Sequence, residues 1–171
     1  PFAFFNGYYD SWCYVPLFGF LSIDDLPEQH LFFARLRPGT GPEGHCVRTL
    51  LRRVVPLLRL RFRKARIVVR LDAGFASSEL FDLLDELKVG YLVAMAKNSR
   101  LKVTAERHMR GVRWITEQFG ETTTLFGECV YGARTWSRAR RVIFKAEVVA
   151  LAGRDPRDNL RFVVTNLRGS A

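Results

Sequence analysis

The most constraining feature of this sequence is the stretch Ile67–Leu87, in which a strand pattern passes into a helix pattern through a single carboxylate. Residues 67–71 are aliphatic and mostly β-branched apart from one arginine, as in a central parallel strand that is covered on both faces. Asp72 ends this run, and the Ala73-Gly74 pair that follows predicts a tight turn. The stretch therefore predicts a buried strand, a turn and a helix, with an acid at the strand end.

The helix after this turn has one apolar face. Its leucines recur at positions i, i+3, i+4 and i+7, namely Leu80, Leu83, Leu84 and Leu87. Ser77 or Ser78 is placed to cap the helix, and Glu79 lies where the helix dipole favours negative charge. Active groups of α/β sheets collect beyond the carboxyl ends of strands, so Asp72 is a candidate catalytic residue. A plain turn or cap residue is the alternative interpretation.

Length and charge bound the class of protein. With 171 residues, the chain fits one domain with a sizeable core. It carries 27 Lys and Arg against 17 Asp and Glu, a net charge of +10, which indicates a polyanionic partner and most simply nucleic acid. A basic protein without such a partner is the alternative. No apolar run approaches the ~20 residues that a membrane span needs, so no membrane partner is expected.

The cysteine pattern and the chain start bear on location. Cys13, Cys46 and Cys129 are odd in number and far apart, which predicts neither a disulfide framework nor a zinc site. They indicate reduced thiols and a cytoplasmic protein. No signal peptide is visible, and the chain opens at Pro1 without an initiator Met, so we expect a fragment of a longer chain.

Basic residues gather in two clusters that are candidate DNA-binding surfaces. The first falls on a helix predicted over residues 44–64, which Pro56 is expected to kink or break. No acid interrupts this cluster, and this favours a phosphate-facing surface over a merely solvated one. For the second cluster, the sequence supports a phosphate-facing surface and a solvated surface equally. The predicted phosphate-facing residues are Arg48, Arg52, Arg53, Arg59, Arg61, Arg63 and Lys64 in the first cluster, and Arg134, Arg138, Arg140 and Arg141 in the second.

The remaining patterns predict a mixed α/β chain. An antiparallel pair is expected at the N-terminal end, and a strand parallel to 67–71 is expected after the leucine-rich helix. The predicted strands are 12–22, 30–37, 91–96, 122–130, 135–136, 141–150 and 160–166, with a helix over 101–118 and a loop over 153–159.

Several segments together carry a family resemblance. They are, in chain order, FFNGYYDSWCYVPLFGF, LRPGT, RLDAGFASSELFDLL, KVGYLVAMAKNSRL, WSRARRVIFKAEV and LRFVVTNL. This ordered set covers nearly the whole chain and resembles the DDE transposases of bacterial insertion sequences, a group related to ribonuclease H.

The resemblance implies an α/β fold, a ribonuclease H-like mixed sheet flanked by helices. Residues 1–121 would form a partial core, 122–152 a β-rich insertion, and 153–171 a loop and the return strand of the core. The first strand of the fold and its last helix would lie outside this chain.

The resemblance also implies a chemistry. Such transposases cleave and join DNA with two Mg²⁺ ions that clustered carboxylates hold for an in-line displacement. Asp72 would be the second aspartate of the triad. The first aspartate and the glutamate would lie before and after this chain, so residues 1–171 alone are expected to be inactive. Four acids are not expected to bind this metal: Asp10, Asp82, Asp85 and Glu147.

The implied partner is double-stranded DNA, both the element ends and the target, and the intact enzyme would be a homodimer. The alternative function is a non-catalytic basic DNA-binding remnant or regulator. A third candidate is an unrelated basic α/β nuclease, which would need other carboxylates clustered near Asp72.

Overall fold

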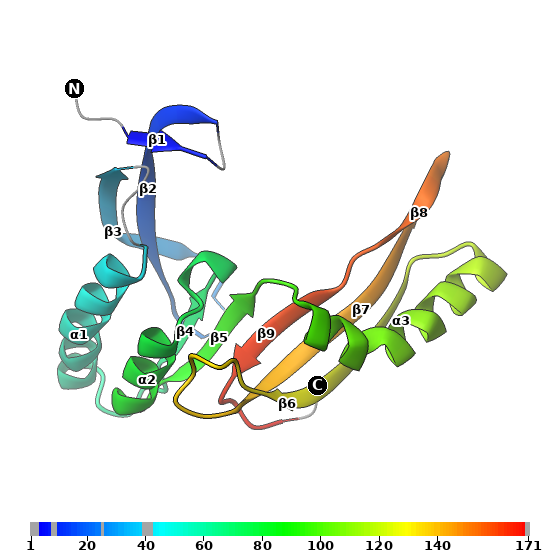
Figure 1. The fold of residues 1–171 in the computed structure, drawn as a ribbon. Coiled ribbons are helices and arrows are strands. Elements are labelled where there is room, and N and C mark those ends of the chain that lie inside the picture. Colours follow the sequence, from blue (N-terminus) through cyan, green and yellow to red (C-terminus); the bar gives the residue numbers. More distant parts are fainter. Residues whose placement is uncertain (1–3, 8–9, 25, 39–42, 170–171) are drawn as a thin grey trace. The chain divides into compact units, whose positions relative to one another are not determined.

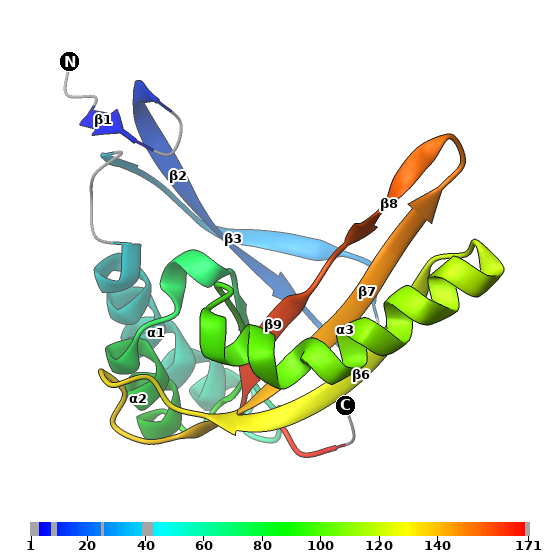
Figure 2. The same cartoon turned by 45° about the vertical axis from the view of Figure 1, so that its right-hand side comes forward.

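The computed structural model describes residues 4–7, 10–24, 26–38 and 43–169 (Figures 1 and 2). The chain divides into two compact units, Pro1–Pro42 and Glu43–Ala171. Each unit has its own sheet, with three strands in the first and six in the second.

The first unit is an antiparallel meander of β1 (Phe4–Asn6), β2 (Ser11–Ser22) and β3 (Gln29–Pro38). The antiparallel pair predicted for residues 12–22 and 30–37 is confirmed. Pro16 lies within β2 opposite Leu36, and the pairing shifts register at Gly19 and Phe20 instead. The small glycine accommodates this irregularity more easily than the residues around it.

The second unit is a mixed sheet with helices, in the strand order β4-β5-β9-β7-β6 and with β8 paired to β7. Its strands are β4 (Val68–Leu71), β5 (Gly90–Met95), β6 (Thr123–Tyr131), β7 (Arg140–Leu151), β8 (Arg154–Asp158) and β9 (Arg161–Thr165). Its helices are α1 (Glu43–Arg61), the short 3₁₀ turn η1 (Ala73–Phe75), α2 (Ser78–Glu86) and α3 (Ser99–Phe119). Among the strands of the described residues, only β4 and β5 are parallel, as predicted for the strand–helix–strand unit. The predicted mixed α/β class is confirmed.

One face of this sheet carries the core. The register aligns Tyr91 and Val93 of β5 with the buried side chains of β9 and β7, among them Phe144. Phe81 of α2 packs on Tyr91 with ring centroids 6.0 Å apart, and His108 of α3 packs edge-on against Phe144 at 4.9 Å. Because Tyr91 and Phe144 point to the same face, α2 and α3 cover one face of the sheet near its opposite ends (Figure 2).

The strand before Asp72 differs from its prediction. Within the described residues, β4 pairs with β5 alone and lies at the end of the sheet. Val69 and Leu71 are half-buried, whereas Val68 and Arg70 are exposed. The expectation of a central strand covered on both faces is therefore wrong for this arrangement, because a run of β-branched residues fits a half-buried end strand equally well.

Three further elements differ from their predictions. The helix α1 is not broken at Pro56, whose side chain is exposed, so the predicted break does not occur. Residues 135–136 form a turn instead of a strand. The predicted loop 153–159 contains β8, which pairs with β7 and is anchored to α3 by an ion pair of 2.6 Å between Asp158 and Arg113.

The segment 122–152 belongs to the same sheet as the rest of the second unit. β7 pairs with β9 along Arg141–Lys145, and β9 pairs with β5. A continuous hydrogen-bonded ladder thus runs from β4 to β6.

Two glycines provide opposite tests of this packing. At Gly127 of β6, an added Cβ would lie 2.4 Å from the ring of the buried Phe144, so Gly127→Ala should lower the free energy of unfolding by about 1–3 kcal/mol. At Gly111 of α3, the nearest atom would be 3.6 Å away, so Gly111→Ala should raise it by about 0.5–1 kcal/mol. Urea denaturation of both variants measures the two shifts. Equal shifts of the unfolding free energy in the two variants would contradict this packing of α3 and β6 against β7.

Candidate active site

Asp72 lies directly after β4, at the carboxyl end of the parallel pair β4–β5 (Figure 1). Its backbone is extended, with φ −79° and ψ 178°, and it forms the N-cap of the turn η1. Its carboxylate oxygen Oδ1 accepts a hydrogen bond of 3.0 Å from the amide of Gly74. The predicted tight turn is thus a single 3₁₀ turn that holds one carboxylate oxygen in place.

The rest of the Asp72 side chain is open. The residue is exposed, and within the described part of the chain no Lys, Arg or His forms an ion pair with it. A carboxylate that is held at one oxygen and open at the other has the donor chemistry that Mg²⁺ prefers, since hard oxygen ligands bind this ion. Asp72 therefore fits the role of one metal ligand.

The helix after η1 begins as predicted. Ser77 is its N-cap, and the Ser77 hydroxyl accepts a hydrogen bond of 3.3 Å from the amide of Leu80. The backbone amide and Ser77 lower the pKa of Glu79 below its ordinary value, since both donate to its carboxylate. The buried Leu80 and Phe81 anchor α2 on the sheet and fix the place of Asp72 at the sheet edge.

The neighbouring strand also ends in a capping residue. Asn98 follows β5 and caps α3, accepting from the amide of Leu101 at 3.0 Å. Its amide nitrogen donates to the hydroxyl of Tyr131 at 3.2 Å. Asn98 is thus engaged in the structure, and it is a residue that the sequence patterns did not single out.

Asp72 belongs to no cluster of three possible metal ligands among the described residues. Across the described residues, no three His, Cys, Asp or Glu side chains come close enough to hold a metal ion. Asp72 alone does not make a two-metal site, because each Mg²⁺ needs several oxygen ligands.

Two acids of α2 are committed to an ion-pair network. Arg140 of β7 donates to Asp82 at 2.7 Å and pairs with Asp85, and it also donates to the hydroxyl of Tyr91 at 3.0 Å. Its guanidinium lies 5.2 Å from the ring centre of Phe81. Asp82 and Asp85 therefore serve to hold β7 against α2.

The structure corrects one predicted phosphate contact. The side chain of Arg140 is only 2% exposed, so it does not face solvent or DNA. Burial opposes its charged form, but the hydrogen bonds that Arg140 donates to Asp85 and Tyr91 outweigh this and raise the pKa of the guanidinium. Side chains alternate between the two faces of a strand, and this alternation puts Arg140 on the inward face of β7. The predicted phosphate contact rested instead on the run of basic residues around Arg140.

The other residues of the second cluster are also partly engaged. Arg141 donates to Glu128 at 2.9 Å and to the carbonyl of Leu167 at 2.6 Å. Arg138 pairs with Asp85 at 2.7 Å but remains 61% exposed. Arg134 is exposed in the turn between β6 and β7. Of this cluster, Arg134 and Arg138 keep the exposure that a phosphate contact needs.

The first cluster stays largely accessible. Arg48 is half-buried, and the other six members are exposed on α1 and in the turn after it: Arg52, Arg53, Arg59, Arg61, Arg63 and Lys64. Arg59 donates to the carbonyl of Lys88 at 3.0 Å, which leaves its charge unneutralised. These residues remain predicted DNA contacts.

Glu147 of β7 pairs with protein groups, as expected. Its hydrogen bond with Lys145 lowers its pKa below the ordinary value of 4.5, and Asn159 and Thr124 add to this against the effect of burial. The stability from this carboxylate is present above pH 4.5 and is lost as the pH falls through its lower folded pKa. Glu147 is buried.

Glu147 gives a pH test. Between pH 7 and pH 3, the urea midpoint of the parent protein should fall further than that of Glu147→Gln, because the variant has no carboxylate to protonate. Glu117→Gln, which changes an exposed acid on α3, should keep the fall of the parent. An identical fall in all three proteins would contradict the role of Glu147.

A mixed α/β sheet with a carboxylate at the end of its parallel pair defines a class of domain compatible with the ribonuclease H-like fold. The comparison with protein families makes this specific. The family described as transposase DDE domain group 1 matches residues 1–171, and the chain belongs to this family. No curated protein matches the sequence. No helix among the described residues is long and apolar enough to cross a membrane.

Proposed function

We propose that this chain is part of the catalytic domain of a transposase that cleaves and joins DNA strands, and that Asp72 is one of the carboxylates that bind its catalytic Mg²⁺. The observation that carries the proposal is the placement of Asp72 at the carboxyl end of β4, exposed and with one oxygen held by Gly74. Membership of the DDE transposase family supports the same reading.

Two parts of the site have separate tasks. Magnesium, when bound, supplies charge stabilisation to the attacking and leaving oxygens of a phosphodiester in an in-line displacement. The amide of Gly74 in the η1 turn holds one carboxylate oxygen of Asp72. Because the carboxylate then cannot rotate freely, its other oxygen has a fixed direction for the metal. The hydrogen-bonded turn thus gives the ligand its orientation before any metal arrives.

The proposal includes the rest of the triad. The resemblance assigns the first aspartate and the glutamate to segments outside residues 1–171, and a single carboxylate does not hold two Mg²⁺ ions. We therefore expect residues 1–171 alone to leave DNA uncut. By the same resemblance, the substrates are the element ends and target DNA, and the working enzyme is a homodimer of insertion-sequence origin.

DNA binding is proposed for the exposed basic residues of α1 and the turn that follows it. The net charge of +10 supports this assignment, because a polyanion is the partner that such a surface attracts. Arg140 is left out of the proposed contacts, and Arg141 contributes less than expected because its guanidinium is already hydrogen-bonded.

The test is DNA cleavage by the full-length protein. Cleavage should require Mg²⁺, and Asp72→Asn should abolish it while the protein stays folded. Cleavage that persists in Asp72→Asn would remove Asp72 from the site.

A non-catalytic DNA-binding protein is the second candidate. It is favoured by the lack of a three-ligand metal group among the described residues, together with the basic surface. It predicts salt-dependent DNA binding without any Mg²⁺-dependent cleavage by the full-length protein. The same cleavage assay therefore separates the two candidates.

A further inference from the structure

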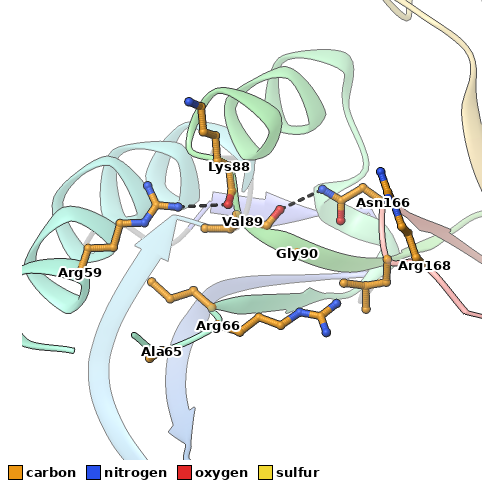
Figure 3. Close-up of a pocket in the computed structure, with 10 residues that line it drawn as sticks. Arg59, Ala65, Arg66, Lys88, Val89, Gly90, Asn166 and Arg168 are labelled. Atoms are coloured by element: carbon orange, nitrogen blue, oxygen red, sulfur yellow. Dashed lines mark hydrogen bonds between the residues drawn. The ribbon is translucent and has the colours of Figure 1, made fainter. Parts of the chain in front are cut away.

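A basic hollow lies at the end of β4 opposite to Asp72 (Figure 3). Its volume is about 580 Å³, and it is lined by α1, the loop before β4, the end of α2, the start of β5 and the segment after β9. Its charged lining residues are Arg59, Arg66, Lys88 and Arg168, and no acid among the described residues lines it. Four cations from four separate segments thus line one open depression.

The charge of this hollow is not neutralised by its surroundings. Within the described residues, neither Arg66, Lys88 nor Arg168 forms an ion pair, and Arg59 donates only to the neutral carbonyl of Lys88. A set of clustered cations without carboxylates repels itself unless an anion binds. The hollow therefore has the electrostatics of an anion site.

Lys88 occupies a backbone position that suits glycine better. Its φ is +50°, in the left-handed region, at the residue where α2 ends. The amide of Val89 donates to the carbonyl of Leu84 at 3.2 Å, and that of Lys88 donates to Asp85 at 2.9 Å, the pattern of a helix end that usually carries glycine. A lysine kept in a strained conformation at the hollow points to a role for its ammonium group.

The floor of the hollow is fixed by hydrogen bonds. The side chain of Asn166 donates to the carbonyl of Val89 at 2.9 Å (Figure 3). It also accepts from the amide of Tyr91 at 3.0 Å. Gly90 lies between these two residues, and a Cβ there would lie 2.6 Å from Leu167. The segments that carry the cations are thus tied together, and the charges are held in place before a ligand arrives.

We propose that this hollow binds a backbone phosphate of DNA. The proposal deepens the proposed function, and it rests on DNA being the partner. The hollow lies at Ile67, about 16 Å along β4 from Asp72 at roughly 3.3 Å per residue. It is therefore a contact separate from the phosphate that Asp72 would serve, and it extends the predicted Arg59 contact with three cations that the sequence did not assign.

The experiment measures the affinity of the full-length protein for a DNA duplex by fluorescence anisotropy across a salt titration. The variants are Lys88→Gly, Arg66→Gln and the two combined, and Arg157→Gln on the exposed strand β8 is the matched loss of one charge. Each lost phosphate contact should reduce the slope of log affinity against log salt by about 0.9. Lys88→Gly should keep or raise the urea midpoint, so weaker binding by this variant does not come from unfolding.

Each outcome decides the proposal. A smaller slope in both single variants, with the Arg157→Gln slope unchanged, supports it. Equal slopes in all proteins overturn it. If inorganic phosphate raises the melting temperature of the parent but not of the combined variant, while the DNA slopes stay equal, the source is a free anion and the DNA assignment is overturned. The Asp72→Asn cleavage test is independent of these measurements. If the hollow does not bind DNA, the proposed catalytic role is still decided by the cleavage test alone.

Discussion

Arg140→Ala should lower the free energy of unfolding by about 3 kcal/mol, because it leaves two carboxylates of α2 without their buried cation. Asp85 is only 22% exposed, so water compensates little for the lost partner. The variant also removes the donor to Tyr91 and the guanidinium packed near Phe81. Urea denaturation at pH 7 measures the loss.

Arg138→Ala is the matched control. Arg138 pairs with the same Asp85, yet its side chain is 61% exposed, and a surface pair of this kind contributes up to about 1 kcal/mol. A loss at Arg140 no larger than the loss at Arg138 would contradict the buried network. Arg140→Met combined with Asp82→Asn and Asp85→Asn should recover part of the stability, because the only partner then left without its ion pair is the exposed Arg138.

This network also shows where sequence reasoning ends. Asp82 and Asp85 lie three residues apart on one side of α2. Their partner Arg140 lies 55 residues after Asp85 in the sequence. Local spacing shows that two acids share a helix side, but it carries no information on what packs against that side. The sequence therefore predicted one basic surface for the whole cluster of arginines, although Arg140 points inward.

The local elements were predictable because their signals are local. The leucine period and the serine cap defined α2, and the strand–turn–helix order placed Asp72 at a sheet edge. The strand β8 carried no such signal, since its five residues are all exposed and include Pro156. Its pairing with β7 is set by the hairpin, in which Gly153 takes a φ of +74°.

The basic hollow could not be predicted from the sequence, for a related reason. Arg66 was part of a visible run, but Lys88 and Arg168 are single cations far from it in sequence. They meet because β4 pairs with β5 and Asn166 ties the segment after β9 to the start of β5. Convergence of this kind follows from sheet order, which the sequence patterns did not predict.

Asp72→Asn should reduce Mg²⁺-dependent DNA cleavage by the full-length protein at least ~10³-fold, which corresponds to about 4 kcal/mol of transition-state stabilisation. Asparagine keeps an oxygen that accepts from Gly74, so the η1 turn is retained while the negative charge is lost. The urea midpoint should therefore stay near that of the parent. Asp72→Ala should lose cleavage too, with an added cost of about 1 kcal/mol for the missing cap.

Glu79→Gln is the matched control for charge, since Glu79 is an exposed acid at the start of α2, close in sequence to Asp72. It should cleave DNA at the rate of the parent. If Asp72→Asn and Glu79→Gln lose activity equally, the effect is a general one of charge near DNA. If Asp72→Asn alone loses cleavage while its DNA affinity is unchanged, the carboxylate acts on the chemical step, because loss of a metal ligand impairs displacement and spares the phosphate contacts made by arginine and lysine.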